Sequence, residues 1–232
     1  MIVGIIAVLG SLLIGPGMRV IKKNVAATTC ASNLRQIGVA FQLFAGENNG
    51  QLPGITSDPT GDADAQDGKG MQWDQQLRTY LDIRDNTTKS PLKKTAYYCP
   101  ASEPDPGYAG KAVTLLSYTY NVNVGRTATS PGIRSGSAPD ASSIMLLADL
   151  ELATSTDLKS YVPQTGQGKN NTIIFRPSST YYKFLAARHS QRMNILFLDG
   201  HVAPRMRVDE NSKSSPPEEV RWTSGGELTG SR

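Results

Sequence analysis

The first fifty residues most constrain the fold, because a single helical pattern runs through them and changes character half-way. No charged side chain occurs between Met1 and Met18, and this apolar run is about as long as a helix needs to cross a hydrocarbon core. A lone segment in a membrane must be helical, since a helix satisfies its own backbone polar groups. We therefore expect residues 1–21 to form a transmembrane helix.

Beyond Lys23 the helical period continues, but its apolar residues keep to one face. They recur at alternating steps of four and three, which is the spacing of an amphipathic helix: Cys30, Leu34, Ile37, Phe41 and Phe44. Asn48-Asn49-Gly50 and Pro53 end the pattern, as glycine and proline commonly do after a helix. Residues 1–50 are thus predicted to be one helix, half in a membrane and half packed on a domain.

A cleaved secretory signal is the alternative interpretation of the apolar run. No basic stretch precedes the run, no persuasive small-x-small cleavage site follows it, and the amphipathic period continues straight through. These features favour an uncleaved anchor.

The rest of the chain predicts a small, mainly antiparallel sheet under this helix, and hence an α+β fold. A short helix over residues 72–83 is expected first, followed by extended segments at 97–100, 113–122, 143–148 and 171–175. Residues 51–208 would form this globular domain. Residues 209–232 are polar and are predicted to be a flexible tail.

The clearest local signal is a β-hairpin. Residues 193–198 and 201–206 flank Asp199-Gly200, a pair that suits a two-residue type I′ turn because both positions tolerate positive φ. The strands should bury Ile195 and Phe197 on one face, or Leu196 and Leu198 on the other.

The N-terminal residues resemble a known helix. Cys30-Ala31-Ser32-Asn33-Leu34-Arg35-Gln36-Ile37-Gly38, with Asn48-Asn49-Gly50, is similar to the N-terminal helix of bacterial type IV pilin-like proteins and type II secretion pseudopilins. Pro16 resembles the helix-softening proline of pilins. Members of that family open the mature, N-terminally methylated helix with a Phe-Thr-Leu-Ile-Glu-Leu-like stretch behind a basic leader. Met1 corresponds to a point inside that helix, so a misplaced start codon or a trimmed chain is expected.

The C-terminal residues resemble one pilin-like subfamily in particular. His189 is followed by nine residues and then Asp199-Gly200, which matches the H-X9-DG pattern. Further residues resemble typical positions of the same subfamily and occur in the same order along the chain: Cys99-Pro100, Ser117-Tyr118, Asn121 and Ala148-Asp149. The resemblance spans nearly the whole chain outside its middle loops.

The resemblance implies a non-enzymatic structural subunit of a pilus-like or pseudopilus filament. It would assemble with other pilin-like subunits through its N-terminal helix, after processing by a prepilin peptidase, with help from the secretion or pilus assembly machinery. The subunit would be single-pass in the inner membrane, with its domain in the periplasm or at the cell surface. Arg19, Lys22 and Lys23 alone favour the opposite orientation, and a basic leader would resolve that conflict.

A membrane-anchored periplasmic enzyme or binding protein is the alternative function. His189, Asp199 and His201 are residue types that bind metals or carry protons. The competing interpretation is structural: Asp199 begins the turn, His189 bonds the backbone near the hairpin, and His201 points into solvent. No nucleophile or phosphate-loop motif accompanies them, and we favour the structural interpretation.

Acidic residues in the loop after the helix offer a second possible site. Asp62, Asp64 and Asp67 could supply oxygen ligands to Ca²⁺, although their spacing differs from an EF-hand loop and a solvated acidic loop is favoured. No other cofactor is expected. The chain of 232 residues has a net charge of +4 with basic residues spread along it, which gives no reason to predict a nucleic-acid partner.

The two cysteines leave two outcomes open. Cys30 lies on the domain-facing stripe of the helix, where the segment carrying Cys99 could pack. If the domain lies outside the cytoplasm, oxidation is permitted, and a disulfide would clamp the helix to the sheet. The alternative is a pair of buried free thiols.

Overall fold

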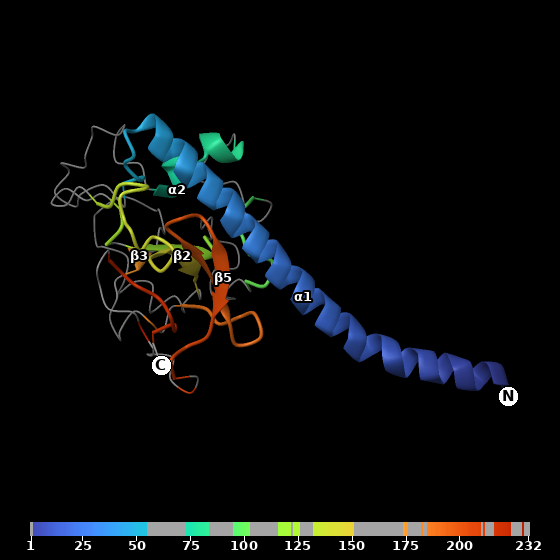
Figure 1. Ribbon diagram of the computed structural model, residues 1–232. Helices are drawn as coiled ribbons and strands as arrows, with labels where there is room; N and C mark the ends of the chain where they lie inside the picture. Colours follow the sequence, from blue (N-terminus) through green and yellow to red (C-terminus); the bar gives the residue numbers. More distant parts are fainter. Residues whose placement is uncertain are drawn as a thin grey trace, which may run out of the picture.

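The computed structural model describes residues 2–54, 73–83, 95–102, 116–121, 123–125, 132–150, 174–175, 182, 185–209, 211, 216–223 and 229; of these, only the backbone is described for 2–22 and 174–175. A long helix, α1 (Ile2–Glu47), crosses one face of a five-stranded sheet, and its N-terminal part extends beyond that sheet (Figure 1). The predicted α+β fold, a long helix on a mainly antiparallel sheet, is confirmed.

The sheet has the strand order β3-β1-β2-β4-β5. Four strands pair antiparallel: β1 (Tyr118–Asn121), β2 (Met145–Asp149), β4 (Met193–Phe197) and β5 (Val202–Arg205). The short β3 (Ile174–Phe175) lies parallel to β1 at the edge. The predicted strands at 143–148 and 171–175 are therefore present, and the strand predicted at 113–122 is described from Tyr118 onward.

The apolar stripe of α1 supplies much of the core. The side chains of Cys30, Leu34, Ile37 and Phe41 are fully buried, and Phe44 is partly buried, as the spacing predicted. The Phe41 ring centroid lies 5.9 Å from that of Trp73 and 5.3 Å from that of Tyr120, so helix and sheet share one aromatic cluster. Burying a side chain such as Phe41 stabilises the fold by roughly 1.5–3 kcal/mol.

A glycine lets α1 approach the sheet closely. A Cβ atom placed on Gly38 would lie 2.9 Å from Cδ1 of Leu196, a buried residue of β4. Real Cβ atoms essentially never come this close to another heavy atom, so a side chain here would require Leu196 to move. The helix ends where predicted, since the N–H groups of Asn48 and Gly50 both donate to the Ala45 carbonyl.

Both faces of the sheet are buried, which differs from the one-sided hairpin that the sequence predicted. Leu196 and Leu198 belong to the core under α1, whereas Ile195 and Phe197 belong to a second core on the other face. The side chains of β2 and β4 are accordingly buried at every position. The sequence predicted that one of the two pairs would be buried, whereas the structure buries both.

Residues 216–223 help to form that second face, so the prediction of a flexible tail from 209 onward is wrong for this segment. Val220 is fully buried, and the Arg221 carbonyl accepts a hydrogen bond from the Met145 N–H at 3.0 Å. The polar composition of this stretch hid the contribution of Val220 and Trp222 to the second core. This segment therefore covers the second core and provides a hydrogen-bond acceptor at the start of β2.

Two further predictions hold only in part. The helix expected over 72–83 is a short α2 (Trp73–Gln76), then a turn, then the 3-10 helix η2 (Thr79–Leu81). Residues 97–100 form turns and irregular backbone rather than an extended strand, although Tyr97 and Cys99 are buried.

Among the residues that the structure describes, no helix is long and apolar enough to cross a membrane. The side chains of residues 1–22 lie outside the described part of α1. The transmembrane segment expected at residues 1–21 therefore stays a prediction.

Candidate functional site

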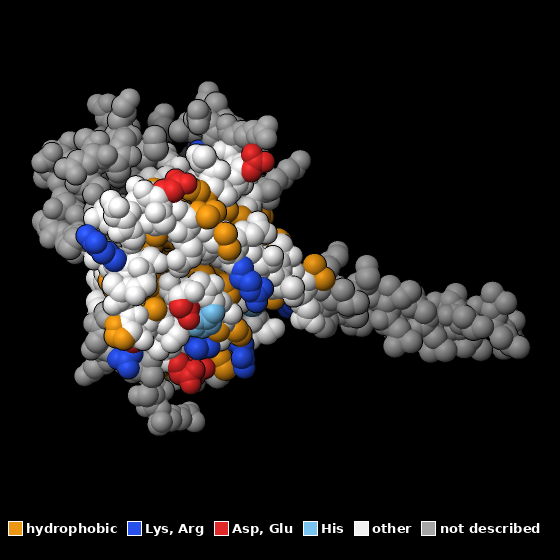
Figure 2. All heavy atoms as spheres, turned by 45° about the horizontal axis from the view of Figure 1, so that its top comes forward, with side chains coloured by type: hydrophobic (Ala, Val, Ile, Leu, Met, Phe, Trp, Pro, Cys, Tyr) orange, Lys and Arg blue, Asp and Glu red, His pale blue; other side chains and the backbone are white. Residues whose placement is uncertain are grey.

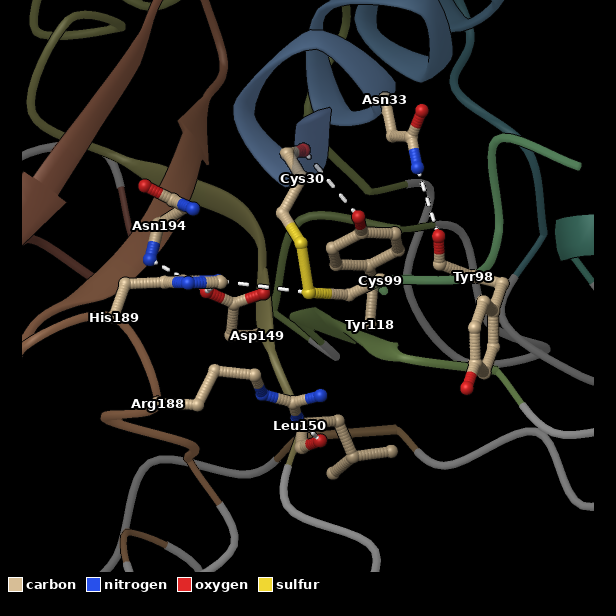
Figure 3. Close-up of polar contacts among 10 residues, drawn as sticks. All are labelled: Cys30, Asn33, Tyr98, Cys99, Tyr118, Asp149, Leu150, Arg188, His189 and Asn194. Carbon is tan, nitrogen blue, oxygen red and sulfur yellow. Dashed lines mark hydrogen bonds and ion pairs between the residues drawn. A yellow bond between two sulfur atoms is a disulfide. The ribbon is translucent and has the colours of Figure 1, made fainter. Parts of the chain in front are cut away.

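Three chain segments meet α1 and bring together two cysteines, a histidine and an aspartate that are all buried. Cys30 comes from α1, Cys99 from the turn-rich segment 95–102, Asp149 from the end of β2, and His189 from the residues just before β4 (Figure 3). These positions are far apart in sequence, so the fold alone assembles the cluster.

Cys30 and Cys99 are joined by a disulfide, with their Cα atoms 4.9 Å apart. Of the two outcomes that the sequence left open, the structure therefore contains the bridge. Cys30 is held on the buried stripe of α1, and Cys99 is fixed because the Ser117 N–H donates to the nearby Tyr97 carbonyl at 3.0 Å. The bridge attaches the helix covalently to the segment that lies against β1.

A buried His–Asp pair lies against this disulfide. His189 Nε2 is 3.3 Å from Asp149 Oδ2 and 3.5 Å from Cys99 Sγ. The same Asp149 oxygen accepts a hydrogen bond from the Asn194 backbone N–H at 2.7 Å, which ties the pair to the start of β4. Two polar atoms of the pair, His189 Nδ1 and Asp149 Oδ1, are buried without a hydrogen-bond partner.

Neighbouring groups fix the cluster in place. The Tyr118 hydroxyl donates to the Cys30 carbonyl at 3.3 Å, and the Asn33 amide donates to the Tyr98 carbonyl at 2.8 Å (Figure 3). Arg188 donates to the Leu150 carbonyl. Burial raises the pKa of Tyr118 well above its usual range, and the nearby Asp149 carboxylate raises it further, so the hydroxyl stays protonated as a donor.

The tip of the hairpin is exposed to solvent, unlike the buried cluster around His189. The Gly200 N–H donates to the Phe197 carbonyl, and the Phe197 N–H donates to the His201 carbonyl, so Leu198, Asp199 and Gly200 form a three-residue loop. Only Gly200 in that loop has positive φ, at 92°. The predicted two-residue type I′ turn is therefore wrong; the geometry is that of a turn closed by a glycine bulge.

The reason for the longer loop is the position of Leu198. Its N–H donates to the Ile144 carbonyl at 2.9 Å and its side chain fills the core under α1, so it cannot pair with His201. Asp199 Oδ1 instead accepts the His201 N–H and lies 2.6 Å from His201 Nδ1. The His201 ring stacks on Phe197, with centroids 4.4 Å apart.

His189 and the Asp199-Gly200 pair are thus not brought together. His189 is buried in the cluster beside Cys99, whereas Asp199 and His201 lie at the exposed tip. The side chain of His189 was predicted to bond the backbone near the hairpin, and among the described residues no such bond is present; its main chain pairs with Arg192 instead. The role of its side chain, which faces Asp149 and Cys99, was not predicted.

The other predicted site residues fall outside the described side chains. The backbone of α1 is helical through Pro16, whose side chain is not described. Asp62, Asp64 and Asp67, proposed as calcium ligands, lie in residues 55–72, outside the described residues.

Sequence reasoning missed Asp149 as the partner of His189. The available signal was a carboxylate directly after an apolar run expected to be a buried strand, because a buried charge requires a partner. His189 is the polar residue that meets it, and only the register of β4 against β2 places the two together.

The chemistry open to the cluster is limited by its burial. The side chains of His189 and Asp149 are 4% and 0% exposed, and the sulfur nearest the imidazole is held in a disulfide. A buried imidazole beside an oxidised sulfur has neither a free nucleophile nor direct access to a solute. In this state the disulfide in the cluster cross-links α1 to the 95–102 segment.

Comparison of the chain with protein-family models, with curated proteins and with solved structures finds no match in any of the three. The function proposed for the chain therefore rests on its fold and on this cluster.

Proposed function

We propose that this chain is a structural subunit of a pilus-like or pseudopilus filament that assembles through its N-terminal helix. The observation that carries the proposal is the division of α1 into two parts. Its C-terminal part is fastened to the domain, while its N-terminal part extends beyond the sheet (Figure 1). A helix used only as an anchor has no need of such a long, rigid attachment to its domain.

The outer face of the described part of α1 supports the proposal. Val25, Val39 and Leu43 are 59%, 60% and 51% exposed, although each is hydrophobic. Val25 and Leu43 lie about five helical turns apart and so point to the same side, opposite the buried stripe. Hydrophobic side chains are visible on the surface over α1 (Figure 2). This face suits contact with a helix of another subunit.

The clamp between helix and sheet gives the subunit the stiffness that a filament requires. The disulfide, the aromatic cluster around Phe41 and the close approach at Gly38 fix α1 at several points along its packed part. Tension applied to the helix would therefore be passed to the whole sheet rather than unwinding the last turns. In the proposal, the domain decorates the filament and the helices form its interior.

Site-specific photo-crosslinking tests this assembly. A photoreactive amino acid at Val39 or Leu43, in a chain carrying a prepilin leader and expressed with an assembly system, should yield covalent dimers and a ladder of larger species. Val208 is the matched control, because it is also an exposed valine (50%) but lies after β5 rather than on α1. Crosslinks that form equally from Val208, or fail to form from both helix positions, would contradict the proposal.

A further inference from the structure

We propose that Cys30, Cys99, His189 and Asp149 form a binding site for Zn²⁺, or a similar divalent ion, when the disulfide is reduced. Ligand atoms of Cys30, Cys99 and His189 lie within 4.8 Å of one another, and all three residues are buried. Asp149 adds a carboxylate oxygen next to the imidazole. Two thiolates, an imidazole and a carboxylate are ligand types that zinc takes in four-coordinate sites.

The distances fit tetrahedral coordination. With zinc–ligand bonds of about 2.0–2.3 Å, the edges of a tetrahedron are about 3.4 Å between nitrogen and oxygen and about 3.6 Å between nitrogen and sulfur. His189 Nε2 lies 3.3 Å from Asp149 Oδ2 and 3.5 Å from Cys99 Sγ. These are two of the six edges of the tetrahedron, and the two sulfurs must also separate once their bond is broken.

The surroundings also favour a cation. The Asn194 N–H holds the carboxylate in position, as groups beyond the ligands commonly do in metal sites. The four side chains come from α1, the 95–102 segment, β2 and the residues just before β4, so an ion here would join the two segments that the disulfide links and also hold two segments of the sheet region.

Reduction and metal binding are two separate chemical steps. A dithiol reductant gives two electrons and two protons to the Cys30–Cys99 bond, becomes a cyclic disulfide, and leaves two protein thiols. Binding of the divalent ion then displaces the two thiol protons into solvent. His189 binds as a neutral imidazole through Nε2, with its proton on Nδ1. The oxidised and the metal-bound states are therefore alternative clamps between the helix and the sheet.

Cobalt titration of the full chain in detergent tests the site. The protein is first purified with its disulfide, then reduced without oxygen by a phosphine, which takes up oxygen from water as its oxide. Co²⁺ is the probe because tetrahedral thiolate ligation gives charge-transfer and intense visible absorption bands. One equivalent should bind to the reduced chain, and none to the oxidised chain. Zn²⁺ should remove the bands and raise the Tm of the reduced chain alone.

Variants identify the ligands. His189→Ala should weaken Co²⁺ binding by at least about tenfold, whereas His201→Ala, which removes the exposed histidine, should leave binding unchanged. Absence of the bands in reduced wild-type protein, equal binding by the oxidised chain, or full binding by His189→Ala would each overturn the proposal. The comparison of oxidised with reduced wild type needs no variant, so it decides the question even if His189→Ala fails to fold.

Discussion

Reduction of the Cys30–Cys99 bridge should lower the free energy of unfolding by about 4 kcal/mol. The two cysteines are 69 positions apart, and opening a loop of that length returns about 15 cal/mol/K of chain entropy to the unfolded state, or about 4.4 kcal/mol at 25 °C. The native side of the comparison changes little, because the two reduced sulfurs need only move apart to van der Waals contact and stay on α1 and the 95–102 segment. The expected loss of stability therefore comes mainly from the greater conformational entropy of the reduced unfolded chain.

Urea denaturation in detergent, with EDTA present so that no metal replaces the bridge, measures this loss. Trp73 is a suitable fluorescent reporter, since it is fully buried between the rings of Phe41 and Tyr97. Oxidised and reduced wild-type protein are compared, and a Cys30→Ala/Cys99→Ala variant should show no response to the reductant. A loss below about 1 kcal/mol, far under the loop-closure value, would refute the view that this bridge constrains the chain.

Three other perturbations address the core, the turn and the buried tyrosines. Phe41→Ala should cost about 3–5 kcal/mol in urea denaturation, whereas Val39→Ala, on the exposed side of α1, should change stability by less than about 0.5 kcal/mol; similar costs would contradict the assigned helix faces. Gly200→Val should lower stability by about 1–3 kcal/mol, because a β-branched residue strains the backbone at positive φ, and a variant that melts like wild type would disprove the bulge. Burial raises the pKa of Tyr97, Tyr118 and Tyr120 more than that of the other tyrosines with a resolved shift, so the contribution of these three to stability should be constant below the unfolded value of about 10 and fall above it, by up to about 1.4 kcal/mol per pH unit for each. Denaturation curves across alkaline pH should show that Tyr120→Phe removes about a third of this slope, and an unchanged slope would argue against the burial of that hydroxyl.

The sequence was sufficient for features that depend on local periodicity. Cys30, Leu34, Ile37 and Phe41 follow the helical period, and α1 buries all four. The hairpin was predictable because two apolar runs flank a turn pair. Its loop length was not, because the Leu198 N–H leaves the hairpin ladder to donate to the carbonyl of Ile144, the residue just before β2.

Features that depend on contacts between distant segments were not predictable. The pairing of Asp149 with His189 requires the register between β2 and β4, and no local pattern encodes it. Val220 likewise fills the second core from a stretch whose composition is typical of a tail. The disulfide could be proposed from the helix stripe, but a choice between bridge and free thiols required knowing where the 95–102 segment lies.

Electron microscopy of sheared filaments tests the central claim most directly. The chain is fused behind a prepilin leader and a glutamate-containing first turn and expressed with a prepilin peptidase and an assembly system, and sheared material is labelled with an antibody against the domain. The proposal predicts cleavage at the leader and labelled filaments, which disappear when the peptidase is omitted. Cleavage at a secretory-type site near Ala27, with release of a soluble monomer and no labelled filaments, would contradict it.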